Sequence, residues 1–401
     1  MFHSLRQIFA QKQLLLLALM IFVQGSAIGS TLPYLSVTAI NELGLSDQTF
    51  SLLIFAASLA AVMIGVSMGI LSDLIGDRRK MMIVIALIGA AGYGAIFFFP
   101  SVPVFVIATV FVIPFYQALS SLLFAGARVQ TAGFAGREAA SVNATLRSFM
   151  SASWVVMPAA MGFAFAGSGS MLGAWGVAAL CALTIFLAAL FLMQKSGGAA
   201  RIERTGPGFF ASLREIASPL MLARMLSMAS LTGTIRLSST LWPLIIIVSL
   251  GGAASDVGII AGLIALLEIP FMLIWAALLR RTSLLSILIA AGLIYAAYMA
   301  ALSFATATWH IYALIIPGSA GAAALLSMPL SYFQDLFPDR PGLGTSLHPI
   351  NAFLGNALTA LAFAAGAHYF GYSGAAWLGV LMVFAGIAGL LLIEKRETQP
   401  A

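Results

Sequence analysis

The sequence predicts an all-α membrane protein whose twelve transmembrane helices form two six-helix repeats. Three observations predict this fold class: the composition, the long segments without charge, and the positions of the basic residues. Of 401 residues, 61% are hydrophobic and only 8% are charged, whereas a soluble domain carries about 25% charged residues. A single water-soluble core cannot cover that much apolar surface, so lipid must be the solvent for most of the chain.

The charge-free segments define most of the expected helices. Each is about 50 residues long, which accommodates two spanning helices of about 20 residues and a turn. The segments without Asp, Glu, Lys or Arg are residues 81–127, 148–194, 282–334 and 341–393. Turn-forming residues lie near their midpoints, at residues 100–103, 167–170, 306–308 and 371–374. Two more hairpins, at about 12–71 and 219–279, turn at loops that contain acidic residues, and six hairpins predict twelve helices.

The basic residues predict the orientation of these helices. All but three of the 19 lie at alternate helix ends, and the opposite loops have none. The exceptions are Arg147, Arg224 and Arg236, which fall within or at the edge of helices. By the positive-inside rule we expect a multi-pass membrane protein with both termini in the cytoplasm. This bias explains the basic pI of about 9.7 without a nucleic-acid partner.

The order of hairpins repeats along the chain. We expect residues 1–194 to form an N-terminal six-helix bundle and residues 219–401 a C-terminal one, joined by a cytoplasmic central loop at 195–218. The loop contains an amphipathic segment that is expected to lie on the membrane surface. The apolar run after Lys12 has no small-residue cleavage site, so we expect it to be the first spanning helix. The single Cys181 and the absence of metal-ligand spacing predict neither a metal nor a cofactor.

One loop motif resembles the signature of the major facilitator superfamily. The stretch GILSDLIGDRRK, residues 69–80, has the Gly-x-x-x-Asp pattern followed by glycine and two basic residues. Asp73 is placed to pair with a loop arginine and a helix N-terminus, and Gly76 makes the turn. The motif departs from the superfamily pattern at Leu74 and Asp77, where many members carry basic residues. Two parallel six-helix repeats with a basic central loop are also typical of this superfamily.

A narrower set of motifs resembles the bacterial sugar efflux transporters. They occur in order between about residues 72 and 347, and include Ser72-Asp73, Ala127-Arg128, Arg137-Glu138, Leu146-Arg147, Leu267-Glu268-Ile269-Pro270 and Phe333-Gln334-Asp335-Leu336. The resemblance implies proton-driven export of sugars or glycosides by alternating access, with a broad substrate range. It also implies a location in the bacterial inner membrane. We therefore expect a small-molecule substrate, protons and the lipid bilayer as partners, and a monomer. Some members of this family carry an acidic residue directly before a Pro-Leu pair in the seventh helix. In this chain the pair is Pro243-Leu244, and Trp242 precedes it.

Glu268 is the only carboxylate well inside a predicted span. A charge near the bilayer centre costs about 2.5–3.5 kcal/mol on insertion scales. Either Glu268 carries the exchanged proton, because an apolar setting favours the neutral carboxyl, or it is a packing residue next to Pro270. Arg147 and Arg236 are the rival partners for its charged form. The internal repeat aligns residues 144–147 with 345–348, so His348 is a further candidate for proton coupling.

As the resemblance implies, the expected substrate cavity is lined by the first, fourth, seventh and tenth of the twelve expected helices, counted along the chain. The eleventh helix adds two amides. Sugars need hydrogen bonds around the ring and an aromatic face for its C–H side. The candidate residues are Gln24, Tyr116, Gln117, Arg236, Ser239, Trp242, Tyr332, Asn351 and Asn356. Each of them has an alternative role, because hydroxyls often bond to their own helix and amides bridge helices.

The charged residues at the cytoplasmic helix ends suit a conformational gate better than a substrate site. The candidates are Asp73, Arg78, Arg79, Arg128 and Asp335. Their alternative role is to set the orientation as solvated loop charges.

Other functions fit the sequence less well. A multidrug or other small-molecule exporter of the same fold stays open, since a drug pocket would differ mainly in being more aromatic. A membrane-embedded enzyme is disfavoured because no Ser-His pair, His-Glu-x-x-His or paired-Asp motif is present. A receptor is disfavoured because the chain has no signalling domain.

Overall fold

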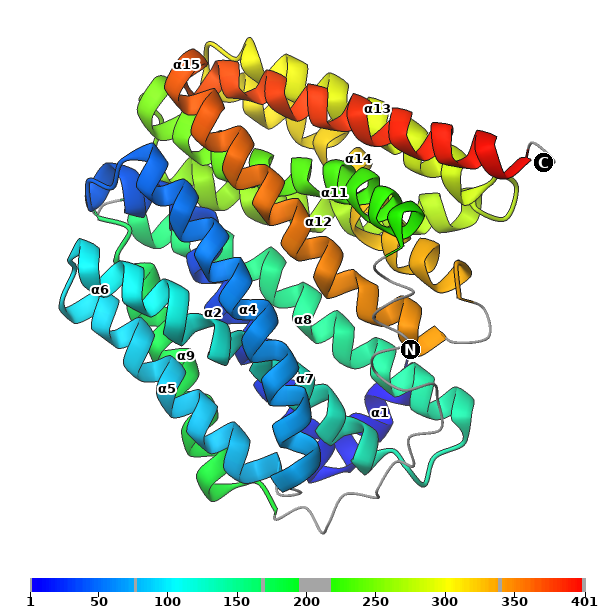
Figure 1. Ribbon diagram of the computed structural model, residues 1–401. Coiled ribbons are helices and arrows are strands. Elements are labelled where there is room, and N and C mark those ends of the chain that lie inside the picture. The colour runs from blue at the N-terminus through cyan, green and yellow to red at the C-terminus, as the bar shows by residue number, and fades with distance from the viewer. Residues whose placement is uncertain (1, 76–77, 167–169, 195–217, 338–340, 399–401) are drawn as a thin grey trace. The chain divides into compact units, whose positions relative to one another are not determined.

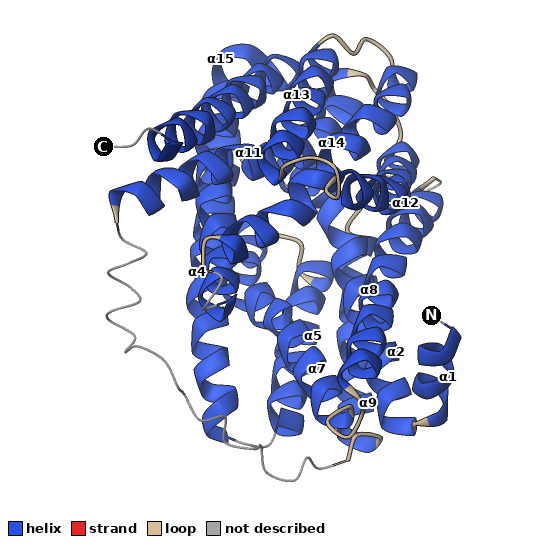
Figure 2. Cartoon of the chain, turned by 90° about the vertical axis from the view of Figure 1, so that its right-hand side faces the viewer, coloured by secondary structure: helices blue, strands red, loops and turns tan. Residues whose placement is uncertain are grey.

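The computed structural model describes residues 2–75, 78–166, 170–194, 218–337 and 341–398. Within these ranges every regular element is a helix (Figure 1, Figure 2). The first half contains α1 (Phe2–Ala10), α2 (Lys12–Thr31), α3 (Leu35–Val37), α4 (Asp47–Ile75), α5 (Arg78–Phe98), α6 (Val102–Ile107), α7 (Ile113–Gln130), α8 (Gly136–Phe165) and α9 (Gly173–Phe191). The second half contains α11 (Pro219–Leu244), α12 (Ala254–Leu278), α13 (Leu284–Ser303), α14 (Thr308–Asp335) and α15 (Pro341–Thr398). The amphipathic segment expected in the central loop lies outside the described residues.

The helices confirm the predicted number of crossings. Eleven helices among the described residues are long and apolar enough to span a membrane. The last of them, α15, contains a non-helical residue, Gly371, with φ 67° and ψ 178°. Only glycine adopts this conformation readily, because any side chain would clash with the backbone. Gly371 therefore separates two spans within α15, and the described chain makes twelve crossings, as the hairpin pattern predicts.

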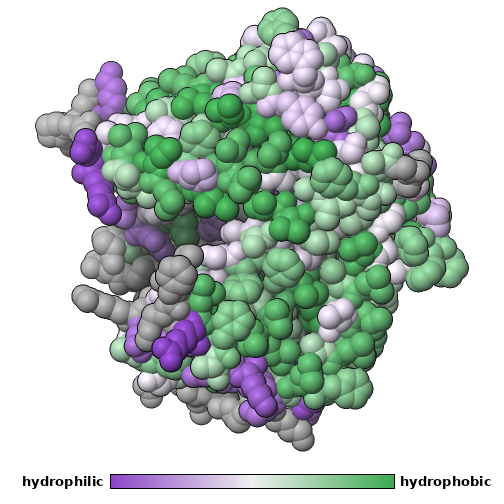
Figure 3. Space-filling view, turned by 180° about the vertical axis from the view of Figure 1, so that it is seen from behind, coloured by the Kyte–Doolittle hydropathy of each residue, from purple (hydrophilic) through white to green (hydrophobic). Residues whose placement is uncertain are grey.

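Large apolar side chains on the helix surfaces indicate lipid as the solvent. Leu52, Phe163 and Leu273 are each 69% exposed. Figure 3 shows a face that is mainly hydrophobic, with hydrophilic residues gathered towards its margins. An apolar surface of this extent is unfavourable in water and favourable against lipid tails.

Wide helical turns interrupt three of the spans. They are η2 (Thr38–Glu42), η3 (Ala108–Val112) and η4 (Ile245–Ser249), all π-helical. Pro114 lies two residues after the end of η3, and Pro243 lies two residues before the start of η4. Proline lacks a backbone N–H and its ring pushes the preceding turn apart, so helices widen or kink beside it. These turns mark where the backbone of the spans departs from regular α-helix.

The described contacts divide the chain into two compact units. Unit 1 comprises Met1–Leu45, Leu59–Ile202 and Val257–Gly262, and unit 2 comprises Ser46–Ser58, Glu203–Asp256 and Leu263–Ala401. The units follow the halves of the sequence except for two short segments, one from α4 and one from α12. Residues 1–194 and 219–401 as two repeated bundles therefore remain a prediction.

Each unit has its own packing core. In unit 1, α2 packs against α8 and α9, and α5 packs against α7 and α9. In unit 2, α11 packs against α15, and α13 packs against α14 and α15.

The crossing of α11 and α15 depends on two glycines. A Cβ at Gly233 would lie 2.8 Å from the carbonyl oxygen of Gly355. The backbones therefore approach more closely than any side chain permits, as in other small-residue crossings of spanning helices. The Thr359 hydroxyl also donates to the Gly233 carbonyl oxygen at 2.8 Å. This crossing holds the polar residues of α11 and α15 in a fixed register.

Candidate functional site

Glu268 lies in α12, two residues before Pro270, and is half-buried in unit 2. It lies close enough to Tyr295 of α13 for electrostatic interaction. No described residue forms a hydrogen bond or an ion pair with its carboxylate. The carboxyl is thus held among apolar side chains without a fixed partner, and such a group is stable chiefly in its neutral form.

Arg236, one of the two predicted partners of Glu268, belongs to unit 2 as Glu268 does. Among the described residues no ion pair joins them, and their pairing stays a prediction. Arg147, the other predicted partner, lies in unit 1. There its guanidinium carbon is 5.7 Å from the centre of the Phe124 ring, a cation–π distance. The pairing of Arg147 with Glu268 stays a prediction.

Arg236 of α11 and His348 of α15 come together in unit 2. Both are exposed, and they are close enough for their charges to interact. The expectation that His348 takes part in proton coupling is untested, but the structure gives it a cationic neighbour.

Asn351, one turn after His348, is only 1% exposed. Its Nδ2 donates to the Thr232 hydroxyl at 3.1 Å, which ties α15 to α11. This is the helix-bridging role that the sequence left open for it. Asn356, also on α15, is half-buried.

Gln24 and Tyr116 are fully buried in unit 1. Gln24 donates from Nε2 to the Tyr116 carbonyl oxygen at 3.3 Å, which joins α2 to α7. The Tyr116 ring meets the Tyr93 ring edge-on, with centroids 5.4 Å apart. Gly89 of α5 makes room for it, since a Cβ there would overlap the Tyr116 ring. These contacts suit the packing role, and a substrate role for the two residues stays a prediction.

The remaining substrate candidates differ in exposure. Gln117 and Ser239 are exposed and Tyr332 is half-buried, whereas Trp242 is only 5% exposed. The Ser239 hydroxyl donates to the Ile235 carbonyl oxygen of its own helix at 2.8 Å, which leaves its lone pairs free to accept. Gln117, Ser239 and Tyr332 are therefore the candidates that a ligand reaches without repacking.

The gate candidates have unequal surroundings. Arg79 is half-buried and donates to the carbonyl oxygens of Ala189 and Leu190, at 2.9 and 2.6 Å. These are among the last carbonyls of α9, which have no partner within the helix, so Arg79 caps α9. Arg78 is half-buried, and Arg128 and Asp335 are exposed. The Asp73 side chain lies outside the described part of the structure.

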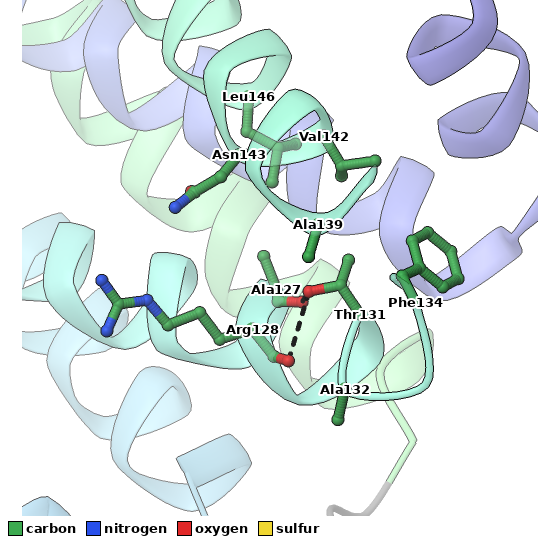
Figure 4. Close-up of a pocket in the computed structure, with 9 residues that line it drawn as sticks. All are labelled: Ala127, Arg128, Thr131, Ala132, Phe134, Ala139, Val142, Asn143 and Leu146. Carbon is green, nitrogen blue, oxygen red and sulfur yellow. Dashed lines mark hydrogen bonds between the residues drawn. The ribbon is translucent and has the colours of Figure 1, made fainter. Parts of the chain in front are cut away.

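A pocket of about 340 Å³ opens between α7 and α8 beside Arg128. Figure 4 shows the Arg128 and Asn143 side chains extending on the same side of the pocket, with Phe134 on the opposite side. Thr131 forms part of the wall and donates to the Arg128 carbonyl oxygen at 3.2 Å. Asn143 escaped the sequence analysis because a polar residue near a helix start is common and carries no specific signal.

Acidic residues at the helix ends also had unrecognised roles. Glu42 accepts hydrogen bonds from the Ser170 hydroxyl and the Met171 backbone N–H, at 2.9 and 2.6 Å. Asp256 accepts from the Tyr312 hydroxyl at 2.9 Å. The sequence marks such acids only as turn residues, because their partners lie far along the chain.

Twelve apolar crossings, with a carboxylate, arginines and a histidine inside the spans, define the chain as a membrane transporter rather than an enzyme. Residues 14–348 match the family model of the Major Facilitator Superfamily, and the chain belongs to this superfamily. The resemblance predicted from the loop motif is thereby confirmed.

The curated relatives include proteins named for sugar efflux. A Deinococcus radiodurans protein with the provisional name of sugar efflux transporter is 27% identical over 358 residues, covering 89% of this chain and 91% of that protein. Sugar efflux transporter A of Dickeya chrysanthemi is 27% identical and covers 81% of both chains. Sugar efflux transporter B of Salmonella typhimurium is 26% identical and covers 93% of both.

Solved transporter structures share the fold. The nucleoside transporter NupG superposes with a TM-score of 0.79 at 13% identity, over 96% of this chain and 99% of that one. The D-xylose-proton symporter superposes with a TM-score of 0.70 at 14% identity, over 96% and 98%. At these identities the likeness concerns the fold alone.

Proposed function

We propose that this transporter exports sugars or glycosides from the cytoplasm in exchange for protons. The observation that carries the substrate class is the similarity to three sugar efflux transporters, each covering 81% or more of the chain. The exposed polar side chains within the spans, Gln117, Ser239 and Arg236, supply hydrogen-bond donors and acceptors of the kind that sugar hydroxyls require.

The proton step is assigned to Glu268. In the protonated state its carboxyl is neutral and stable in an apolar setting. The transporter therefore changes between its inward-facing and outward-facing states at a low cost in free energy. Exposure to the side of lower proton concentration releases the proton, and an arginine, Arg147 in this proposal, stabilises the anion. The absence of a fixed partner among the described residues supports this role, because a permanent ion pair would hold the carboxylate charged.

Alternating access is the proposed route. The substrate reaches the site from one side of the membrane at a time, and the charged residues at the cytoplasmic helix ends set the balance between the two states. Asp73, Arg78, Arg128 and Asp335 belong to this gate in the proposal, while Arg79 already has a structural role at the end of α9. Both termini are placed in the cytoplasm of a bacterial cell.

The test is flux in proteoliposomes that contain the purified full chain. Radiolabelled glucose, lactose, methyl glucoside and ethidium are each followed with and without an imposed pH gradient. We expect sugar or glycoside movement that accelerates with a proton gradient of opposite direction and stops with a protonophore. Movement of ethidium alone would assign the chain to multidrug export, and sugar movement insensitive to the gradient would remove the antiport step.

A further inference from the structure

The spans carry more positive than negative charge. Glu268 is the only carboxylate well inside them, whereas Arg147 and Arg236 both lie within spans. Each charge in the apolar part of the bilayer costs about 2.5–3.5 kcal/mol, and buried charges are therefore paired or neutralised. The chain's own residues supply too few carboxylates to do this for both arginines.

Arg236 carries a positive charge that no described residue neutralises. Its guanidinium makes no hydrogen bond or ion pair with any described residue, and Glu268 of the same unit does not reach it. Its charged or chargeable neighbour is His348, whose interaction with Arg236 is repulsive when the imidazole is protonated. Two such groups side by side destabilise each other unless an anion lies between them.

The two side chains are held in register by the contacts below them. Asn351, one turn from His348, bonds to Thr232, one turn from Arg236. The close approach of Gly233 to Gly355 fixes the same crossing. Arg236 and His348 therefore form a preorganised pair, and both are exposed and accessible to a ligand. Ser239, three residues after Arg236 and also exposed, adds a neutral hydrogen-bonding group.

We infer that Arg236 and His348 bind an oxyanion carried by the substrate, so that the preferred substrate is an acidic sugar or glycoside. The guanidinium plane offers two parallel N–H donors to a carboxylate or phosphate. The imidazole donates one further N–H in either charge state. Neutral hydroxyls accept such bonds but do not neutralise the guanidinium. This inference rests on the proposed function and narrows its substrate class.

The experiment compares matched ligands on the purified full chain by isothermal titration calorimetry in detergent. The pairs are methyl glucuronide against methyl glucoside, and glucose 6-phosphate against glucose. We expect at least one anionic member to bind about tenfold more tightly than its neutral partner, which corresponds to about 1.4 kcal/mol. Preference for glucuronide identifies a carboxylate substrate, and preference for glucose 6-phosphate identifies a phosphorylated one.

Variants then assign the preference to the pair. Arg236→Gln and His348→Gln are each expected to reduce the anion preference about tenfold, because the affinity for the anionic member falls much more than the affinity for its neutral partner. Arg236→Lys keeps the positive charge but lacks the two parallel N–H donors of the guanidinium, and it should retain part of the anion preference. Arg280→Gln removes a positive charge from an exposed residue between α12 and α13 and serves as the control. If Arg236→Gln fails to fold, Arg236→Lys and His348→Gln carry the test.

The outcomes separate this inference from the proposed function. Equal binding of neutral and acidic sugars by the wild type overturns the inference and leaves sugar export standing. An equal loss for both ligand types in Arg236→Gln also overturns it, because the arginine would then serve neutral hydroxyls or the fold. Absence of binding by every sugar, with retained ethidium transport, rejects the proposed function itself.

Discussion

The Tyr372 hydroxyl donates a 2.9 Å hydrogen bond to Oδ1 of Asp47, although 325 residues separate them in the sequence. Asp47 is the first residue of α4, and Tyr372 directly follows the break at Gly371. Below this bond, the rings of Phe50 and Phe363 pack edge-on with centroids 5.6 Å apart. The bond therefore ties the start of α4 to the break in α15 within unit 2.

Loss of this bond should destabilise unit 2. Tyr372→Phe removes only the hydroxyl, and we expect a loss of about 1 kcal/mol, since the acceptor is a carboxylate but the site is partly open to solvent. A double-mutant cycle with Asp47→Asn in a thermal-unfolding assay measures the coupling. Tyr369→Phe is the control, because this residue is 73% exposed. Additive effects of the two single variants would show that the bond contributes nothing.

Arg79 should matter as a helix cap rather than as a loop charge. Arg79→Gln removes both bonds to the end of α9, and Arg79→Lys keeps the charge but not the two-pronged geometry. We expect both variants to lose about 1–3 kcal/mol of stability, since two part-buried carbonyls at the end of α9 lose their donor. Thermal unfolding in detergent measures this. Wild-type stability in Arg79→Lys would indicate that the charge alone suffices.

The α11–α15 crossing should not tolerate a side chain. Gly233→Ala brings a Cβ against the Gly355 backbone, and we expect a loss of about 1–3 kcal/mol or more from overpacking. Gly65→Ala is the matched control, because nothing lies within 4 Å of the Cβ it would gain. In the interior of a helix that change is neutral or stabilising, by up to about 1 kcal/mol. Equal stability of the two variants in the same unfolding assay would contradict the close approach.

Glu268→Gln should uncouple the proton from the substrate. The amide resembles the neutral carboxyl in shape but carries no exchangeable charge, so binding and substrate exchange should persist while pH-driven efflux is lost. Flux in proteoliposomes with imposed pH gradients measures both. Asp335→Asn, at the exposed end of α14, is the comparison. If Glu268→Gln retains full gradient-driven efflux, Glu268 is a packing residue, and Asp335 and His348 become the next candidates for coupling.

The predicted orientation is open to a labelling test. After Cys181→Ala removes the native thiol, single cysteines at positions 203 and 340 should react only from the cytoplasmic side, and one at position 306 only from outside. The reason is that Arg201 and Arg204 flank the first position and the second is itself Arg340, whereas no lysine or arginine lies near the third. A membrane-impermeant maleimide on intact cells reports this. Outside labelling at 203 or 340 would overturn the proposed topology.

The sequence by itself determined the class of protein and the number of crossings. Lipid demands apolar runs of defined length, and charges are excluded from them, so composition and charge spacing alone predict the helices. The turn at residues 371–374 was predictable because turn-forming residues lie midway along a charge-free segment. The structure places a conformation that favours glycine at Gly371. The unusual position of Glu268 could also be identified from the sequence, because a carboxylate inside an apolar run is costly in a bilayer and therefore stands out.

Only the tertiary structure decided what the polar side chains contact. Gln24 and Tyr116 are polar residues in a span, but the rotation of α2 and α7 and the space left by Gly89 bury them against each other. Asp47 looks like an ordinary turn residue until the fold brings Tyr372 to it. Arg236 and His348, far apart in the sequence, become neighbours where α11 and α15 cross at Gly233 and Gly355. The side-chain pattern along one helix is local, whereas these contacts depend on how neighbouring helices are rotated and how closely they pack.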